Sequence, residues 1–177
     1  MKELIRLLRQ EDIIYREPVK LTSGQPAEFY IDVKKAYGNP GIKKLMAKLI
    51  SMQVSPQATC LASSGYGGIP LASSVSEITS LPLILVRDTP KKHGKGGFID
   101  GYNPNQEDRV CLIDDVLTTG GSLIKLEQRI SQLHAKILEA LVVVKRGEPK
   151  LPFPFNYLIT AEDLLWQNKK YQQEATT

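Results

Sequence analysis

The sequence has few cysteines and no long hydrophobic run. Among its 177 residues only Cys60 and Cys111 are cysteines, and each lies in a short apolar segment. Cysteines in such segments are typical of small buried side chains rather than of disulfides or metal ligands, which favours a reducing environment. No apolar stretch reaches the roughly 18 residues of a membrane-spanning helix, and the first residues alternate charge with leucine instead of forming a signal sequence. We therefore expect a cytoplasmic protein without a membrane segment.

Strong charge and the common nucleotide-binding motifs are also missing. The net charge of +4 is mild, and no block of Lys and Arg goes beyond short pairs, so the charge does not by itself indicate nucleic acid. A small anionic substrate explains it equally well, and nucleic acid is an unlikely partner. Neither the P-loop spacing nor Gly-x-Gly-x-x-Gly occurs, and there is no internal repeat. Any phosphate site must use another loop.

The length and the order of the apolar segments predict one α/β domain. A chain of 177 residues is long enough for one domain with a substantial core and short for two. Strands alternating with amphipathic helices indicate a mostly parallel twisted sheet flanked by helices. We expect a single domain over 1–177, with a small N-terminal part at 1–40 (called the hood region below), an α/β core at 41–166 and a polar tail at 167–177.

Individual elements follow from apolar periodicity and turn residues. Helices are expected at 2–10, from Pro40 to about 50, at 69–78, at 123–130 and after Thr160, where Asp163 completes a capping-box-like start. Strands are expected at 59–62, 83–86, 110–113, 137–144 and 157–160. The apolar runs in 19–24 and 29–32, separated by a polar turn, predict a hairpin outside the main sheet.

The chain is organised around the stretch 109–123. Its apolar run Val110–Ile113 is typical of a strand buried on both faces, and it stops at the adjacent acids Asp114 and Asp115. The residues that follow carry hydroxyls or lack a Cβ atom and directly precede a helix: Thr118, Thr119, Gly120, Gly121 and Ser122. Such a loop at the positive end of a helix dipole can hold a phosphate through backbone N–H groups.

The acid pair requires a different partner from the phosphate. Adjacent carboxylates at a strand end can accept hydrogen bonds from two vicinal hydroxyls, or hold Mg²⁺ through its water shell. A sugar phosphate with a free diol would satisfy both halves of the stretch. The plainer alternative is an ordinary strand-to-helix connection, which Asp-Asp or Thr-Thr-Gly alone would favour.

Two further segments can contribute to the same edge of the sheet. Ser63–Gly68 reads as a second small-residue loop, which is either a tight turn or a diphosphate cradle. The segment 87–101 looks too polar and glycine-rich to pack, and it is either a surface loop or a cationic lid over a polyphosphate. Arg146 follows the Val-rich strand and is a candidate anion contact.

These motifs together resemble the type I phosphoribosyltransferases, and along nearly the whole chain those that act on orotate. The resemblance rests on 21–24 with 29–32, on 65–70, on Arg87 with Lys91 and His93, and on 109–123. It implies transfer of phosphoribosyl from phosphoribosyl diphosphate to orotate in pyrimidine synthesis, with Mg²⁺ held mainly by substrate and water. It also implies a homodimer.

The resemblance assigns roles to particular residues. It implies catalytic roles for Arg87, Lys91 and His93. It implies that phosphoribosyl diphosphate contacts Asp114, Asp115, Thr118, Thr119, Gly120, Gly121, Ser122, Gly65, Tyr66 and Gly67. For orotate, it implies contacts with Thr118, Arg146, Phe29 and Tyr30.

Two alternatives remain open at this point. One is a phosphoribosyltransferase for another base, and the other is a regulatory protein that binds phosphoribosyl diphosphate without turnover. Lys91 and His93 favour catalysis, whereas Asp88 places a carboxylate where related enzymes have an ammonium group that binds diphosphate.

Overall fold

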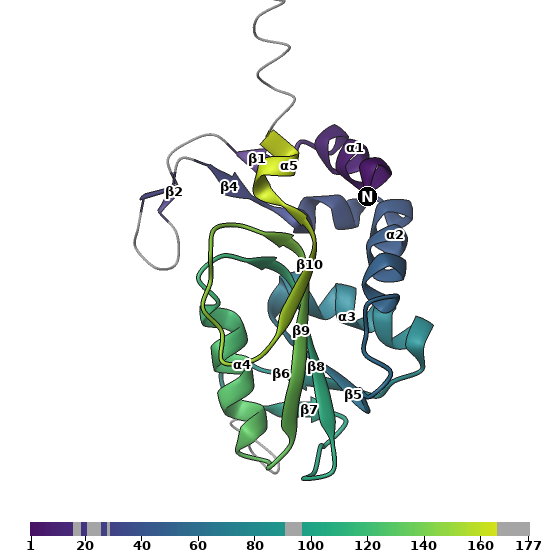
Figure 1. Cartoon of the computed structure of the whole chain (residues 1–177), viewed down its shortest axis with the longest axis vertical. Helices are drawn as coiled ribbons and strands as arrows, with labels where there is room; N and C mark the ends of the chain where they lie inside the picture. Colours follow the sequence, from purple (N-terminus) through teal and green to yellow (C-terminus); the bar gives the residue numbers. More distant parts are fainter. Residues whose placement is uncertain (16–18, 21–25, 28, 91–96, 166–177) are drawn as a thin grey trace, which may run out of the picture.

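A six-stranded sheet forms the centre of the protein (Figure 1). The computed structural model describes residues 1–15, 19–20, 26–27, 29–90 and 97–165. The strand order is β10-β9-β8-β5-β6-β7, and each pair is parallel except β6 with β7. The strands are β5 (Cys60–Ser64), β6 (Leu83–Val86), β7 (Ile99–Gly101), β8 (Arg109–Leu117), β9 (Lys136–Lys145) and β10 (Phe155–Thr160). The predicted mostly parallel α/β sheet is confirmed.

Helices cover both faces of this sheet. They are α1 (Lys2–Gln10), α2 (Pro40–Ser51), α3 (Gly65–Thr79), α4 (Gly121–Ser131) and α5 (Ala161–Leu165). Alternate residues of β8 point to opposite faces: Cys111 and Ile113 pack with α2 and α3, whereas Val110 and Leu112 pack with α4. Figure 1 shows α4 on one side of the sheet and α2 and α3 on the other.

The N-terminal region forms two small ladders outside the sheet. β1 (Ile14–Tyr15) pairs with β4 (Tyr30–Ile31), and β2 (Val19–Lys20) pairs with β3 (Pro26–Ala27). The sequence predicted instead that the run at 19–24 would pair with that at 29–32, and this pairing is wrong. The reason is burial: Ile13 and Ile31 are 1% and 3% exposed, so the overlooked apolar pair at 13–14 fixes the partner of β4.

Helix ends follow local capping rules. The Asn39 side chain accepts hydrogen bonds from the N–H groups of Gly41 and Ile42 at 3.1 and 3.4 Å, with Pro40 in the first turn of α2. At the start of α5, Asp163 N–H donates to Thr160 Oγ1 and Thr160 N–H donates to Asp163 Oδ2, at 3.2 and 2.8 Å. This is the predicted capping box.

Two predicted boundaries are wrong, and both lie at the edge where the site forms. β8 continues through the acid pair to Leu117, because it pairs with β9 as far as Lys145. The predicted loop at 63–68 is divided between the end of β5 and the first turn of α3, so that Pro70 lies inside the helix. Tertiary contacts hold this glycine-rich turn in helical form despite its low helix propensity.

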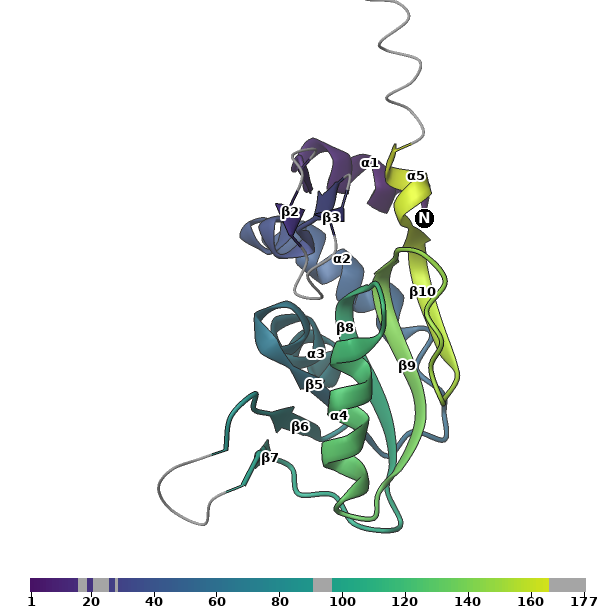
Figure 2. The ribbon, with the colours of Figure 1, turned by 90° about the vertical axis from the view of Figure 1, so that its left-hand side faces the viewer.

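The described residues of the polar insert that follows β6 pack against the sheet edge, contrary to expectation. Ile99–Gly101 pairs with β6 as β7, and Arg87 N–H donates to the Phe98 carbonyl at 2.8 Å. Figure 2 shows this pair at the sheet edge opposite β10. Phe98 and Ile99 supply the apolar anchor, and Arg129 of α4 lies 4.4 Å from the Phe98 ring centroid.

Asp108 directly precedes β8 and joins neighbouring segments of the chain through hydrogen bonds. Its buried carboxylate accepts hydrogen bonds from Thr59 Oγ1 at 2.7 Å, Asn105 N–H at 2.9 Å and the Tyr102 hydroxyl at 3.1 Å. Asp108→Ala leaves these donors without their acceptor, so we expect a loss of about 2–3 kcal/mol in the free energy of unfolding. Urea unfolding measures it, with the exposed neighbour substitution Glu107→Ala as control. Equal midpoints for the two variants would contradict the prediction.

Candidate functional site

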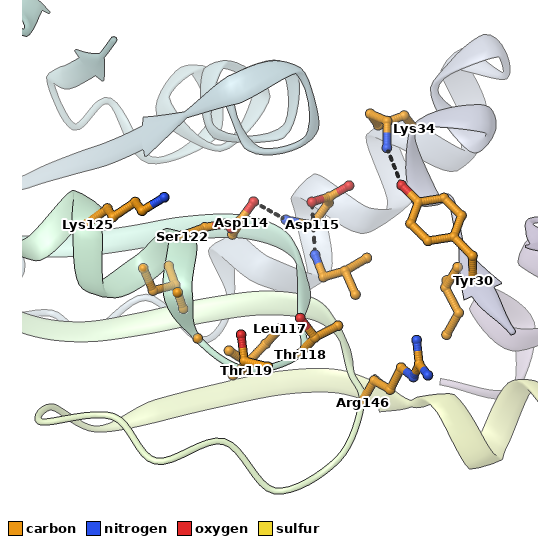
Figure 3. A pocket seen from close by; sticks show the side chains of 15 residues that line it. Tyr30, Lys34, Asp114, Asp115, Leu117, Thr118, Thr119, Ser122, Lys125 and Arg146 are labelled. Carbon is orange, nitrogen blue, oxygen red and sulfur yellow. Dashed lines mark hydrogen bonds between the residues drawn. The ribbon is translucent and has the colours of Figure 1, made fainter. Parts of the chain in front are cut away.

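A cavity of about 400 Å³ lies at the carboxyl end of β8. Its walls come from the hood region, the β8–α4 connection and the segment after β9 (Figure 3). It is lined by Tyr30, Ile31, Lys34, Asp114, Asp115, Val116, Leu117, Thr118, Thr119, Gly120, Gly121, Ser122, Leu123, Lys125 and Arg146. The acids, the hydroxyl and glycine loop, Tyr30 and Arg146 were all expected near one site, and the fold brings them together.

The acid pair lies within the last residues of β8 and is bound by the strand's own backbone. Asp115 N–H donates to Asp114 Oδ1 and Val116 N–H donates to Asp115 Oδ1, each at 2.9 Å. Burial, together with repulsion from Asp115, raises the pKa of Asp114 well above its usual value. Two carboxylates held this closely are a costly arrangement that a hydroxyl-bearing or cationic ligand would relieve.

The loop after the acids leads into α4 with exposed backbone donors. Gly120 has φ +84°, which favours glycine, and a Cβ atom there would lie 2.5 Å from Leu151 Cδ2. No side chain hydrogen bond caps this end of α4. The first N–H groups of a helix lack intrahelical partners, and the helix dipole favours an anion beside them. The loop therefore has the properties of a phosphate site.

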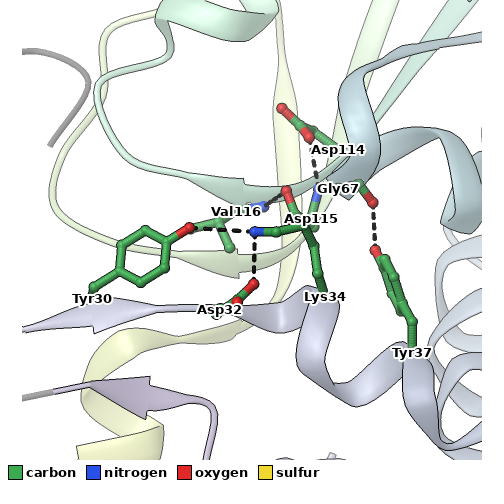
Figure 4. Close-up of polar contacts among 8 residues, drawn as sticks. All are labelled: Tyr30, Asp32, Lys34, Tyr37, Gly67, Asp114, Asp115 and Val116. Atoms are coloured by element: carbon green, nitrogen blue, oxygen red, sulfur yellow. Dashed lines mark hydrogen bonds and ion pairs between the residues drawn. The ribbon is translucent and has the colours of Figure 1, made fainter.

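Lys34 lies on the opposite wall and faces the acid pair. It belongs to the 3₁₀ helix η1 (Val33–Gly38), and its Nζ lies 2.6 Å from Asp32 Oδ1 and 3.3 Å from the Tyr30 hydroxyl (Figure 4). Burial alone would lower the pKa of Lys34, but Asp32, Tyr30 and Asp115 raise it above the ordinary value. The ammonium therefore stays charged at neutral pH.

Sequence reasoning missed Lys34 and Lys125, which are two of the cations lining the cavity. A signal existed for Lys34, because it lies two residues beyond the run at 29–32 that was already assigned to the site. Lys125 is one turn into the helix that begins at the phosphate-like loop, and helix periodicity places it near that loop.

Arg146 projects into the cavity from the segment after β9. Its guanidinium carbon lies 4.4 Å from the Phe29 ring centroid, a stacking geometry that holds the planar group in place. The carboxylate of the nearby Glu148 pairs with Lys145 Nζ, which lies 2.7 Å from it. The guanidinium group of Arg146 is thus oriented toward the cavity, beside Phe29 and Tyr30, which were also predicted for the site.

The predicted residues of the second loop do not line the cavity, but one of them, Gly67, packs against its acid pair. Gly65, Tyr66 and Gly67 form the first turn of α3, with Tyr66 92% exposed. Gly67 approaches Asp115 so closely that a Cβ atom would lie 2.4 Å from Asp115 Oδ1. This turn therefore belongs to the same site through Asp115.

Of the three predicted catalytic residues, the described part of the chain includes only Arg87. Arg87 forms an ion pair with Asp100 at the base of β6 and β7 and is absent from the cavity lining. Arg129 donates hydrogen bonds to the carbonyls of Arg87 and Asp88, the latter at 2.8 Å. Lys91 and His93 lie outside the described residues.

No helix of the described residues is long and apolar enough to cross a membrane. The same residues contain no group of three or more His, Cys, Asp or Glu side chains placed to hold a metal ion.

Comparisons with known proteins identify relatives over most of the chain. It is 37% identical over 150 residues to the orotate phosphoribosyltransferase of Pyrococcus furiosus, which covers 83% of this chain and 82% of that protein. It is 33% identical over 180 residues to the orotate phosphoribosyltransferase of Thermococcus kodakarensis, which covers 97% of both. The solved structure of Leishmania donovani UMP synthase matches with a TM-score of 0.82 and 25% identity, covering 98% of this chain and 40% of that longer chain. No family model matches the chain.

The acid pair predicts a pH-dependent effect of Asp114→Asn. Because the pKa of Asp114 is raised in the folded protein, the folded state keeps a proton that the unfolded chain has lost. The contribution of Asp114 to stability therefore falls as the pH rises above its unfolded-state pKa of about 4, and Asn lacks this titration. We expect the Tm of Asp114→Asn to rise relative to wild type between about pH 4 and pH 7.

Thermal unfolding followed by circular dichroism at several pH values measures this difference. Asp88→Asn, at an exposed aspartate outside the cavity, is the control. A Tm difference for Asp114→Asn that stays constant across this range would contradict the prediction.

Proposed function

We propose that this chain, which belongs to the orotate phosphoribosyltransferase family, transfers the 5-phosphoribosyl group from phosphoribosyl diphosphate to orotate. The products would be orotidine 5′-monophosphate and diphosphate, a step of pyrimidine nucleotide synthesis. The observation that carries the proposal is one cavity lined by an acid pair, an uncapped helix start and a stacked arginine.

The loop Thr118–Ser122 would hold the 5-phosphate. Its backbone N–H groups and hydroxyls are donors at the positive end of α4, and Lys125 adds a charge to the same wall. Asp114 and Asp115 would then accept hydrogen bonds from the two ribose hydroxyls. The turn Gly65–Gly67 would contribute to the diphosphate side, because it packs against Asp115.

The hood region and Arg146 would hold the base. Orotate carries a carboxylate and ring carbonyls, which need donors near the sugar C1. Arg146 offers a planar, permanently charged donor fork, positioned by Phe29, and Tyr30 lines the same wall. The Thr118 hydroxyl, which also lines the cavity, is a further donor.

The chemistry requires positioning and charge neutralisation rather than a covalent nucleophile. As the bond from C1 to the diphosphate breaks and a ring nitrogen of orotate bonds to C1, positive charge develops on the ribose and negative charge on the diphosphate. Preorganised cations stabilise that change, and an enclosed site excludes water that would hydrolyse the sugar. We propose that Arg87, Lys91 and His93 act on the leaving diphosphate.

Mg²⁺ is part of this proposal. The two carboxylates of the acid pair are too few to enclose a metal ion, but Mg²⁺ commonly keeps several waters and uses one or two carboxylates with substrate phosphates. These residues therefore fit an ion held mainly by substrate and water. When bound, it would neutralise charge on the diphosphate.

We also propose a cytoplasmic homodimer. This part rests on the family resemblance and, for the compartment, on two buried unpaired cysteines, Cys60 and Cys111. Light scattering coupled to size exclusion measures the mass, and a monomer at assay concentration would contradict the dimer.

The decisive experiment measures diphosphate release from phosphoribosyl diphosphate with a panel of bases. We expect release with orotate and Mg²⁺, little with uracil, adenine or hypoxanthine, and none when Mg²⁺ is chelated. Release with a different base instead of orotate would show that the chain is a phosphoribosyltransferase for that base. Calorimetric binding of phosphoribosyl diphosphate without release for any base would indicate a regulatory binding protein instead.

Arg146→Lys tests the assignment of the base site. Lysine keeps the charge but loses the planar fork and its stacking on Phe29, so we expect the KM for orotate to rise at least about tenfold. The KM for phosphoribosyl diphosphate should change much less. Lys145→Arg is the matched control, because Lys145 is the adjacent cation, pairs with Glu148 and does not line the cavity. Steady-state kinetics with each substrate varied in turn gives both constants, and an unchanged orotate KM would remove Arg146 from the base site.

A further inference from the structure

The first turn of α3 lies unusually close to the acid pair. A Cβ atom built on Gly67 would lie 2.4, 2.5 and 2.6 Å from Oδ1, Cγ and Oδ2 of Asp115. Real Cβ contacts are longer than 3 Å, so no side chain fits at Gly67 while Asp115 keeps this position. The next residue is equally constrained, since a Cβ atom on Gly68 would lie 2.2 Å from Ser63 Oγ and 2.9 Å from the Ile113 carbonyl.

Tyr37 holds this turn in place. Tyr37 belongs to η1, and its hydroxyl donates to the Gly67 carbonyl at 2.5 Å (Figure 4). Burial, with the nearby charges of Asp115 and Asp114, raises the pKa of Tyr37, so the phenol stays protonated and remains a donor. The Gly67 carbonyl therefore has a fixed partner that restricts the approach of α3 to the acids.

Two contacts restrict one carboxylate. Asp115 Oδ1 accepts from Val116 N–H at 2.9 Å, which ties the carboxylate to β8, and Gly67 lies so close to the same oxygen that a Cβ atom would come within 2.4 Å of it. Asp115 also lies beside the first turn of α3, where a helix dipole favours negative charge. Its orientation is thus set by a turn far from it in sequence.

We propose that Gly67, pinned by Tyr37, positions the Asp115 carboxylate for the ribose hydroxyls. Both are positioning residues. Gly67 must lack a side chain so that the Asp115 carboxylate keeps its position, and not only so that a diphosphate can reach the backbone. This inference rests on the proposed function, because it deepens the role of the same site.

Gly67→Ala is the direct test. The methyl group meets the movable end of a side chain instead of backbone, so the variant folds and the Asp115 carboxylate swings aside. We expect calorimetric affinity for phosphoribosyl diphosphate to fall at least about tenfold while the orotate KM changes less than about twofold. Gly38→Ala is the control, because a Cβ atom on Gly38 meets nothing within 4 Å. Tyr37→Phe, which keeps the ring and removes only the donor, should show a smaller loss of the same kind.

A double-mutant cycle separates this role from direct diphosphate contact. In the Asp115→Ala background there is no carboxylate to displace, so Gly67→Ala should change the affinity for phosphoribosyl diphosphate by less than about twofold. If the losses from Gly67→Ala and Asp115→Ala are additive, Gly67 acts on the diphosphate itself and the inference is overturned.

A measurement on the free protein tests the positioning role of Gly67 independently of the proposed function. If the wild-type protein binds no phosphoribosyl diphosphate, the proposed function fails, and the carboxyl ¹³C resonance of Asp115 in the free protein becomes the readout. Gly67→Ala should shift that resonance and Gly38→Ala should not. An Asp115 resonance that does not respond to Gly67→Ala overturns the positioning role, whatever the protein binds.

Discussion

Repulsion between the adjacent carboxylates of Asp114 and Asp115 is the constraint on which the site depends. Burial of Asp114 beside a second carboxylate raises its pKa, so in the free protein this pair is held against its own electrostatics. The surroundings reduce that cost in three ways. Backbone N–H groups of β8 bind both side chains, Lys34 faces them across the cavity, and the first turn of α3 lies beside Asp115. A diol bound by the pair would relieve the remaining strain.

The acid centre explains the distribution of charge around it. The cations that line the cavity, Lys34, Lys125 and Arg146, surround the acid pair. A ligand that is anionic at its ends and carries hydroxyls in its middle matches this pattern, as phosphoribosyl diphosphate does. The cations also favour an anionic base over a neutral one, because a carboxylate would pair with Arg146 without disturbing the acids.

Helix α4 links the phosphate-like loop to the base of the β6–β7 connection. Its first turn follows Gly120, and near its end Arg129 binds the carbonyls of Arg87 and Asp88 and stacks on Phe98. Both ends of the segment that carries Lys91 and His93 are therefore attached to the helix that begins at the phosphate-like loop.

The sequence by itself determined the parallel strands of the sheet, its alternating helices and the chemical identity of the organising stretch, but not β7. These features are local: apolar periodicity, capping residues such as Thr160 with Asp163, and a run of acids, hydroxyls and glycines need no distant partner to be recognised. Only the tertiary structure decided which strand pairs with β4, how far β8 runs past the acids, and that the glycine turn at 65–68 is helical. It also decided that Lys34 and Tyr37 reach the acid pair while Arg87 turns to Asp100. Each of these depends on contacts between residues far apart in the chain, which burial and close packing select and which local pattern does not encode.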